Sequence, residues 1–328
     1  MENISDFVEE LRKNEYIKER KFGNISSFNF TRKAFYDAVW NSMTTKARGL
    51  FINTATNKIV ARSYNKFFNI DEVSETSPSN LCRTLKFPVV AYVKENGFLG
   101  IVSYNEETDG LFISTKGSVD GEYSDRLKTI FYLSTTPQTR NDVKTFLKEN
   151  DVSFVFECVD PENDPHIIEY KETHLFLLDA IKNEIEFHKY SYDSLVELSK
   201  RFDFEVKKKA CTITNIMDFG DWVDKVSSVG YTYNEEPIEG FVVEDASGFM
   251  FKIKTSYYKT WKHIRSLAEK YVNGKISKEK RIGEPDDIFV DFIRDMKPET
   301  SLVFPLRNNF EQWFEENKSN YLDKPENV

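Results

Sequence analysis

The sequence predicts an α+β fold built on antiparallel sheets, followed by a small helical domain. Paired apolar runs separated by short polar turns indicate hairpins, and the segments between these pairs have helical spacing. No βαβ pattern repeats, which argues against a parallel sheet. With 328 residues, 40% of them hydrophobic, the chain can bury a sizeable core. We expect an α+β domain over residues 1–258 and a helical domain over residues 259–328.

The first expected element is an amphipathic helix, because apolar side chains recur at helical spacing within residues 4–11. From about residue 47 the pattern changes to paired strands. Turn-forming residues separate the strands of each pair, as in the DASG stretch at 245–248. This pattern predicts hairpins over residues 49–64, 89–104, 97–117, 173–190 and 239–254.

Helices are expected between the hairpins and again after the last one. Apolar residues from Tyr257 to Tyr271 step by four, three, three and four, which is typical of a helix. The remaining helical segments are predicted over residues 125–133, 141–150, 191–202, 217–229, 286–296 and 308–322. The C-terminal part of the chain is therefore expected to be helical throughout.

The charge of the chain is unevenly distributed. The net charge is −9, but residues 252–281 hold ten Lys or Arg against two acids, which leaves −17 on the rest. A basic stripe on an acidic protein can attract a phosphate backbone locally. A solvated helix face with internal salt bridges explains the same pattern equally well. Charge alone therefore leaves both interpretations open.

Cysteine use and hydropathy indicate the compartment. Three widely spaced cysteines without a C-x-x-C motif indicate neither a disulfide framework nor a zinc site: Cys82, Cys158 and Cys211. The N-terminus is acidic and amphipathic, unlike a signal peptide, and no apolar run is long enough for a membrane helix. We expect a soluble cytoplasmic protein that does not bind membranes.

Lys94 lies in the KENG stretch between two strand-like runs, where a lysine is most often an exposed turn residue. A functional role requires a neutral amine, because an ammonium group is not nucleophilic. Neighbouring cations and partial burial would lower the pKa of Lys94. A phosphorus atom is the target that suits such an amine. Transfer of a phosphate group needs further cations and a metal held by carboxylates.

Residues of these types occur elsewhere in the chain. Lys252 and Lys254 are two apart on a predicted strand, so both point to one face. Glu157 and Glu239 lie within or beside apolar strands, where a carboxylate is costly unless it binds something. Each also has a simpler interpretation: a solvated strand face for the lysines, an internal salt bridge for Glu157 and a turn acid for Glu239.

Short motifs in this order resemble a known superfamily. KENG at 94–97, FECV at 156–159, EGFVV at 239–243 and KIK at 252–254 are similar to motifs I, III, IV and V of the covalent nucleotidyltransferases. ARGLF, KFFN and TKGS resemble the phage-type RNA ligase I family and the adenylyltransferase domain of fungal tRNA ligases. DNA ligases and capping enzymes do not share KFFN and TKGS. The resemblance covers about residues 25–260, and residues 166–181 lie where the family keeps its motif IIIa region.

The resemblance implies an ATP-dependent RNA ligase with an antiparallel-sheet nucleotidyltransferase domain and a helical C-terminal domain. Lys94 would attack the α-phosphorus of ATP and form a lysyl-AMP intermediate. AMP would then pass to an RNA 5′-phosphate, and a 3′-hydroxyl would displace it to seal the strand. The implied cofactors are ATP and Mg²⁺ or Mn²⁺. The implied partners are RNA ends, broken tRNA among them, and an end-healing kinase or phosphatase on a separate chain.

The resemblance also implies a role for each residue. Lys252 and Lys254 would neutralise the α-phosphate and lower the pKa of Lys94, while Glu157 and Glu239 would hold the metal through water. The implied nucleotide-binding residues are Arg48, Lys66, Phe68, Glu95, Gly97, Lys116 and Tyr258. Only one of the two neighbouring phenylalanines of KFFN can face away from the core, and a helix-core role for Tyr258 stays open.

One position departs from the family pattern, because Asn96 replaces the aspartate of K-x-D-G. Fungal tRNA ligases also carry asparagine there, but an amide is a poorer partner for metal-bound water than a carboxylate. Asn96 favours one alternative, an RNA-binding protein that has kept the fold and lost the chemistry. A second alternative is a DNA ligase or capping enzyme, which would carry a β-barrel after motif V, and the helical tail lacks the strands for one.

Overall fold

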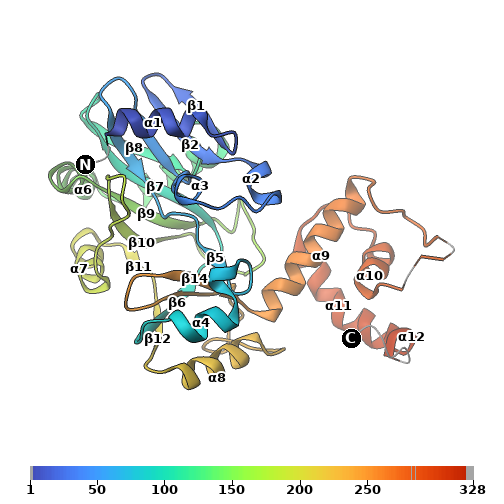
Figure 1. The fold of residues 1–328 in the computed structure, drawn as a ribbon. Helices are drawn as coiled ribbons and strands as arrows, with labels where there is room; N and C mark the ends of the chain where they lie inside the picture. Colours follow the sequence, from blue (N-terminus) through green and yellow to red (C-terminus); the bar gives the residue numbers. More distant parts are fainter. Residues whose placement is uncertain (1–2, 282, 285, 323–328) are drawn as a thin grey trace.

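Two five-stranded sheets face each other, and a four-stranded sheet packs against one of them (Figure 1). The computed structural model describes residues 3–281, 283–284 and 286–322. Antiparallel pairing dominates, with parallel contacts only between β10 and β11 and between β14 and β5 among the described strands. The predicted α+β class is confirmed.

The four-stranded sheet has the order β1-β2-β3-β4: β1 (Ile17–Phe22), β2 (Ile25–Phe30), β3 (Leu50–Asn53) and β4 (Lys58–Arg62). α1 (Ile4–Lys13) covers it with three buried apolar side chains, as the helical spacing predicts. β3 and β4 form the predicted hairpin. The β1–β2 hairpin was not predicted, because charged residues interrupt its apolar pattern. Gly23 turns it with a φ of +61°, and this Gly-Asn pair was the available signal.

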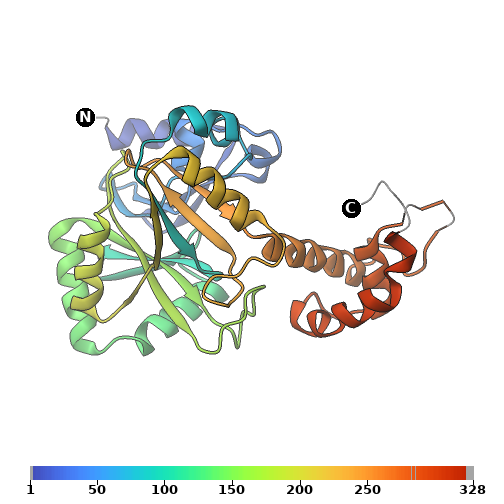
Figure 2. The ribbon, with the colours of Figure 1, turned by 90° about the horizontal axis from the view of Figure 1, so that it is seen from below.

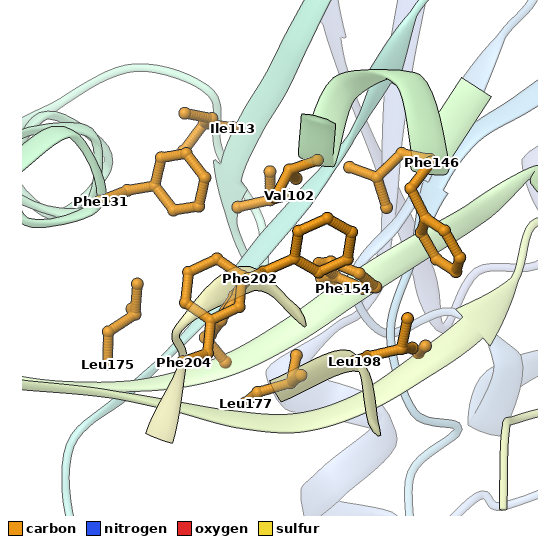
Figure 3. Close-up of a cluster of buried hydrophobic side chains, with 14 of the residues drawn as sticks. Val102, Ile113, Phe131, Phe146, Phe154, Leu175, Leu177, Leu198, Phe202 and Phe204 are labelled. Carbon is orange, nitrogen blue, oxygen red and sulfur yellow. The ribbon is translucent and has the colours of Figure 1, made fainter. Parts of the chain in front are cut away.

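The first five-stranded sheet has the order β11-β10-β9-β7-β8: β7 (Phe98–Asn105), β8 (Gly110–Thr115), β9 (Val152–Val159), β10 (His174–Lys182) and β11 (Glu205–Val206). Its outer face packs against α5 (Glu122–Leu133), α6 (Pro137–Asn150) and α7 (Tyr192–Phe202). Figure 3 shows this core, in which Phe154 of β9 lies among Phe146, Phe202 and Phe204. The aromatic interior makes this sheet a rigid support for what lies on its other face.

The second five-stranded sheet has the order β12-β6-β13-β14-β5: β5 (Phe68–Asn69), β6 (Val89–Lys94), β12 (Lys209–Ile213), β13 (Gly240–Glu244) and β14 (Met250–Lys254). α4 (Pro78–Thr84) and α8 (Ile216–Ser227) cover its outer face. β14 buries Phe251 and Ile253 on that covered face. Alternation therefore turns Lys252 and Lys254 to the inner face, toward the other sheet.

The predicted hairpin over residues 89–104 is wrong. β6 pairs with β12 and β13, whereas β7 pairs with β8 and β9 in the opposite sheet. Both edges of β6 are thus occupied by distant strands, which leaves no edge for β7. Residues 95–97 instead carry the chain from one sheet to the other. Lys94 ends β6 at this crossing.

The predicted hairpin over residues 173–190 is only half right. β10 forms, but residues 183–190 form no strand and contribute one isolated bridge, between Ile181 and Lys189. The guanidinium of Arg62 donates hydrogen bonds to the carbonyls of three successive residues, 184 to 186. Those carbonyls are therefore not available to a sheet. The hairpins at 97–117 and 239–254 are confirmed as β7–β8 and β13–β14.

The C-terminal part is helical, as predicted, with α9 (Ser256–Val272), α10 (Ile288–Met296), α11 (Val303–Asn317) and α12 (Ser319–Leu322). α9 leaves the sheets as a long rod and carries the other helices away from them (Figures 1 and 2). Trp261, Phe292 and Trp313 lie in a core of their own. The boundary at residue 258 stays a prediction, and residues 323–328 of the predicted domain lie outside the described residues. The short elements are α2 (Arg32–Tyr36), α3 (Ser42–Lys46) and η1 (Ser74–Thr76).

Candidate active site

A central cavity lies between the two five-stranded sheets. Five residues predicted from the sequence line it: Arg48, Lys94, Glu95, Glu157 and Lys252. They come from both five-stranded sheets, from the crossing between them and, in the case of Arg48, from the segment before β3. The fold thus brings together side chains that are as much as 204 residues apart.

Lys94 Nζ donates to Glu239 Oε2 at 3.0 Å and to the carbonyl of Glu95 at 3.2 Å. Burial lowers the pKa of Lys94, but the negative charges of Glu239 and Glu157 outweigh burial and raise it above its ordinary value. The lowered pKa predicted for Lys94 is therefore wrong. The sequence did not show that a carboxylate would lie closer to this amine than any cation. Lys94 is held as an ammonium group beside the cavity.

Glu239 is buried and fixed by three donors. Its Oε2 accepts from Lys94 and also from Asn96 Nδ2 at 2.9 Å, and its Oε1 pairs with Lys254 Nζ at 3.1 Å. Burial raises the pKa of Glu239, and the two lysines outweigh that effect and lower it. Glu239 does not line the central cavity but lies behind Lys94. Gly240 follows it with a φ of +150°, and a Cβ there would lie 2.0 Å from the carbonyl of Ile253.

Lys252 is the lysine whose pKa is strongly lowered. Burial and the charges of Lys66, Arg48 and Lys94 bring the pKa of Lys252 to about 7. Its ammonium lies 4.9 Å from the ring centre of Phe67 and has no salt-bridge partner within the described part of the chain. A cation with no partner in a cavity suits an incoming anion.

Glu157 faces the cavity from β9, whose other face forms the aromatic core. Its Oε1 accepts from the backbone N–H of Gly97 at 2.9 Å. Burial raises the pKa of Glu157, and Lys94 partly offsets that effect. A Cβ on Gly97 would lie 2.1 Å from the carbonyl of Cys158, so only glycine lets the crossing pack this closely on β9.

Arg48 and Lys116 extend the positive charge around the cavity. Arg48 Nη1 donates to the carbonyl of Tyr64 at 3.3 Å. Lys116 is exposed in the turn after β8 and does not line the central cavity. The surrounding protein and the charges of Arg48, Lys18 and Lys66 lower the pKa of Lys116, which places it in the same positive field.

A second, outer cavity adjoins the first and shares Phe67 and Met250 with it. Lys66 and Phe68 line this outer cavity and not the central one. Lys66 Nζ lies 3.8 Å from the ring centre of Phe68 and pairs with Glu72 at 3.2 Å. Of the two phenylalanines of KFFN, Phe67 lines both cavities, whereas Phe68, which the sequence assigned to the nucleoside, lines only the outer one of the two.

Lys254 and Tyr258 line a third cavity, beside the start of α9. Lys254 Nζ lies 4.6 Å from the ring centre of Tyr258. Tyr258 is only 7% exposed and packs in the C-terminal core, so it has the helix-core position that the sequence left open. It still contacts the site through Lys254.

Asn96 is buried and connects three segments. It donates to Glu239, its Oδ1 accepts from the N–H of Ile168 at 3.2 Å, and its backbone N–H donates to Tyr170 Oη at 2.8 Å. Tyr170 Oη also donates to Glu95 Oε2 at 2.9 Å. Asn96 therefore fixes a carboxylate by donating to it, which an ionised aspartate could not do.

Several residues of the central cavity were missed by the sequence reasoning. They include Tyr64, Tyr92, Lys207 and Glu244. Lys207 Nζ pairs with the buried Asp179 at 2.7 Å and lies 4.5 Å from the ring centre of Tyr92. A charged residue next to a hydrophobic run, as in the FEVKKK stretch, was the available signal for Lys207. These residues combine aromatic rings with polar groups.

No group of three or more His, Cys, Asp or Glu side chains within the described residues is arranged to hold a metal ion. Glu157 and Glu239 are nevertheless carboxylates beside Lys94, and hard divalent cations prefer oxygen ligands.

No described helix is long and apolar enough to span a membrane.

Known sequences that are similar to this chain are described as RNA or tRNA ligases. A family model described as RNA ligase matches residues 46–258. The chain is 28% identical over 316 aligned positions to a tRNA ligase of Candida albicans, covering 82% of this chain and 36% of that protein. It is 26% identical over 260 positions to tRNA ligase 1 of Schizosaccharomyces pombe, covering 71% and 33%. The chain thus spans about a third of the length of these relatives.

Solved structures share the fold. A putative ATP-dependent DNA ligase from Aquifex aeolicus has a TM-score of 0.54 at 17% identity, covering 96% of this chain and 74% of that chain. An archaeal ATP-dependent RNA ligase has a TM-score of 0.54 at 12% identity, covering 94% and 78%. At these identities the likeness concerns the fold, which is the predicted antiparallel nucleotidyltransferase type.

Proposed function

The chain belongs to the RNA ligase family, and we propose that it joins RNA 5′-phosphate and 3′-hydroxyl ends with ATP, through a lysyl-AMP on Lys94. One observation carries the proposal. The amine of Lys94 lies at the wall of the central cavity, with unpaired Lys252 and the guanidinium of Arg48 on the same cavity. An amine facing clustered cations suits attack on a phosphorus atom whose oxygens those cations hold.

In the first step, Lys94 Nζ bonds to the α-phosphorus of ATP, and the bond from that phosphorus to the β-phosphate oxygen breaks, so pyrophosphate leaves. The ammonium must first lose a proton, and Glu239 Oε2 is its nearest carboxylate oxygen at 3.0 Å. AMP then passes to an RNA 5′-phosphate, and the 3′-hydroxyl of the other end displaces AMP. Each step transfers charge among phosphate oxygens, which positioned cations stabilise.

The cations divide naturally between phosphate groups. Lys252 faces the cavity beside Lys94, so we assign it to the α-phosphate. Lys66 lies toward the outer cavity, which suits the β- and γ-phosphates and the leaving pyrophosphate. Arg48 lies close enough to both lysines to lower the pKa of each. Lys116 adds to this field, and Lys254 acts through Glu239.

We assign the adenine base to the central cavity. Phe67 and Tyr92 line this cavity with aromatic rings, and Lys207 and Glu244 offer polar groups for the edge of a base. We assign the nucleoside to Phe67 rather than to Phe68, because only Phe67 of the two lines the central cavity. Glu95 lies at the crossing and lines the same cavity, and a hydrogen bond from Tyr170 fixes its side chain.

The carboxylates fit a hydrated divalent cation. Glu157 Oε2 has no hydrogen bond within the described residues, and Glu157 lines the cavity beside Lys94. Mg²⁺ or Mn²⁺ would neutralise charge on the phosphates when bound. Glu239 is already engaged by two lysines and an amide, so we assign it mainly to placing Lys94 and Lys254.

The RNA substrate is assigned from charge and position. Lys259, Lys262 and Arg265 of α9 make no ion pair within the described residues, so the basic stripe on this helix is not internally neutralised. We propose that residues 1–258 carry the chemistry and that residues 259–328 help to choose the RNA, broken tRNA among the candidates. A cytoplasmic location, and end-healing enzymes on a separate chain, stay predictions.

Strand joining tests the proposal. Wild-type protein, ATP and Mg²⁺ or Mn²⁺ should convert a 5′-phosphorylated, 3′-hydroxyl RNA to circles or ligated products, and GTP should not replace ATP. The Arg48→Ala and Lys252→Met variants should lose sealing, whereas Lys128→Met, on the surface of α5, should keep it. Wild-type protein that binds RNA but joins no ends with either metal would contradict the proposal and favour a non-catalytic RNA-binding protein.

A further inference from the structure

An exposed group of aromatic rings lies beside the outer cavity. α2 turns two neighbouring rings toward solvent, with Phe35 54% and Tyr36 79% exposed, while Ala34 between them and the helix start is fully buried. The helix is thus anchored by one small side chain and presents its aromatic residues outward. Large apolar side chains in adjacent exposed positions mark a contact surface more often than scattered ones do.

The rings continue from the surface into the outer cavity. Phe35 contacts Tyr36 and Trp40 at ring-centre distances of 6.1 and 6.4 Å, and Trp40 contacts Phe68 at 5.2 Å. All three contacts are edge-to-face. Phe35 and Tyr36 are both exposed, so their rings are accessible to a planar ligand. We call Phe35, Tyr36, Trp40 and Phe68 the aromatic platform.

Positive charge accompanies the aromatic platform. Lys66 Nζ lies 5.1 Å from the ring centre of Trp40 and 3.8 Å from that of Phe68. Arg32, exposed on α2, makes no ion pair within the described residues, while Lys33 pairs with Glu15. Aromatic faces beside cations are the combination that binds single-stranded nucleic acid, because bases stack and phosphates pair with the cations.

The position of the platform connects it to the reaction. The outer cavity shares Phe67 and Met250 with the central cavity, so an RNA strand bound to the platform would extend toward Lys94. α2 also lies on the side of the molecule from which α9 extends (Figures 1 and 2). α2, which carries two of the platform residues, and α9 therefore lie on the same side of the protein.

We propose that the aromatic platform stacks unpaired bases at the RNA end that is to be joined, and thereby holds that end next to the lysyl-AMP. The occupant is single-stranded RNA, and the inference rests on the proposed function. A base has a π-face whatever its identity, so binding here is tolerant of sequence. The platform selects an open end over a paired one.

Fluorescence with the full chain tests the platform. A short unstructured RNA carrying a 5′-phosphate and 2-aminopurine near one end reports both affinity and base stacking. Phe35→Ala/Tyr36→Ala is the main variant, and both positions are exposed, so folding is not at risk. Tyr132→Ala is the control, because Tyr132 on α5 is 52% exposed and lines none of the cavities described above. Tyr36→Phe keeps a ring, and Tyr36→Leu keeps only bulk.

The double variant should raise the Kd for RNA by about 10-fold or more, because stacking on one ring typically contributes that much. The 2-aminopurine quenching should be lost, while the salt dependence of Kd should not change, since no cation is removed. Tyr36→Phe should behave as wild type and Tyr36→Leu should not. Formation of lysyl-AMP needs no RNA and should be unaffected.

An unchanged Kd in the double variant would overturn the inference and assign the rings to a protein contact. Equal binding by Tyr36→Leu and Tyr36→Phe would also overturn it, because bulk alone would then suffice. Absence of lysyl-AMP in the wild type is a separate result, which would overturn the proposed function and not the RNA contact.

Discussion

Glu239 holds two lysines at once, Lys94 at 3.0 Å through Oε2 and Lys254 at 3.1 Å through Oε1. The same carboxylate therefore positions Lys94, the proposed nucleophile. Its negative charge also raises the pKa of Lys94, so the amine is held as an ammonium group.

The Glu239→Gln variant should lower the pKa of Lys94, because it removes the largest effect that raises that pKa. The neutral fraction of an amine rises tenfold for each unit by which its pKa falls. Reaction of Lys94 with an amine-selective reagent at pH 8, mapped by mass spectrometry, should therefore increase by about 10-fold or more. Glu244→Gln is the control, since Glu244 lies in the same cavity but pairs with Lys189. Equal reactivity of Lys94 in the two variants would contradict the assignment.

Nucleotide binding should take up a proton at Lys252. The pKa of Lys252 is about 7, and nearby phosphates would raise it by favouring the ammonium form. Affinity for a non-hydrolysable ATP analogue should therefore be constant below pH 7 and fall as the pH rises above it. Calorimetry in buffers of different ionisation enthalpy measures the proton uptake at pH 8. Lys252→Met should abolish that uptake and Lys128→Met should not; uptake that persists in Lys252→Met would assign the proton to another group.

Replacing Asn96 by aspartate should destabilise the protein, although it restores the commoner K-x-D-G motif. The variant loses the donor to Glu239 and places a second carboxylate beside it, which raises the pKa of the new acid. An acid whose pKa is raised on folding destabilises above its unfolded pKa of about 4, and the loss grows with pH until the raised pKa is passed.

Urea unfolding at pH 5 and pH 8 measures this effect. Asn96→Asp should lose about 1–3 kcal/mol at pH 8 and less at pH 5. Asn141→Asp, at an exposed position of α6, is the control and should show little change at either pH. A loss in Asn96→Asp that does not depend on pH would contradict the proposed repulsion between the two carboxylates.

The hydroxyl of Tyr170 should position the crossing for catalysis. It accepts from the backbone N–H of Asn96 and donates to Glu95, and the segment before it is held by Arg307 of α11 through the carbonyl of Ile167. Tyr170→Phe should slow lysyl-AMP formation by about 10-fold, because a buried N–H loses its acceptor. Tyr190→Phe, whose hydroxyl contacts Asn150 away from the site, is the control. A normal rate in Tyr170→Phe would show that the contact is only structural.

The sequence predicts local features of this fold well. Turns such as DASG at 245–248 specify hairpins because the two strands are neighbours in the chain, and helical spacing specifies α1 and α9 in the same way. The crossing after Lys94 could not be predicted, because it depends on β6 pairing with strands far away in the sequence. A short polar stretch between two strands looks the same in a hairpin and in a crossing.

The candidate site shows the same division. Motif order brings Lys94, Glu157 and Lys252 to one cavity, as the sequence suggests. The pKa of Lys94 depends on which charge lies nearest in space. The position of Phe67 depends on how the chain approaches the two-residue strand β5, which begins at the next residue. Lys207 and Tyr92 belong to no motif and are brought to the cavity by the fold alone. Their roles are visible only once the sheets are assembled.

The most direct test of the central claim is to find AMP on Lys94. The protein is incubated with α-labelled ATP and Mg²⁺ or Mn²⁺, denatured, and digested for mass spectrometry. We predict acid-labile label in the wild type, one added AMP on the peptide that contains Lys94, and none in Lys94→Met. The Lys208→Met variant, altered at an exposed lysine nearby, should still be labelled. Label that persists in Lys94→Met, or wild-type protein free of bound AMP that takes up no label with either metal, would contradict the account.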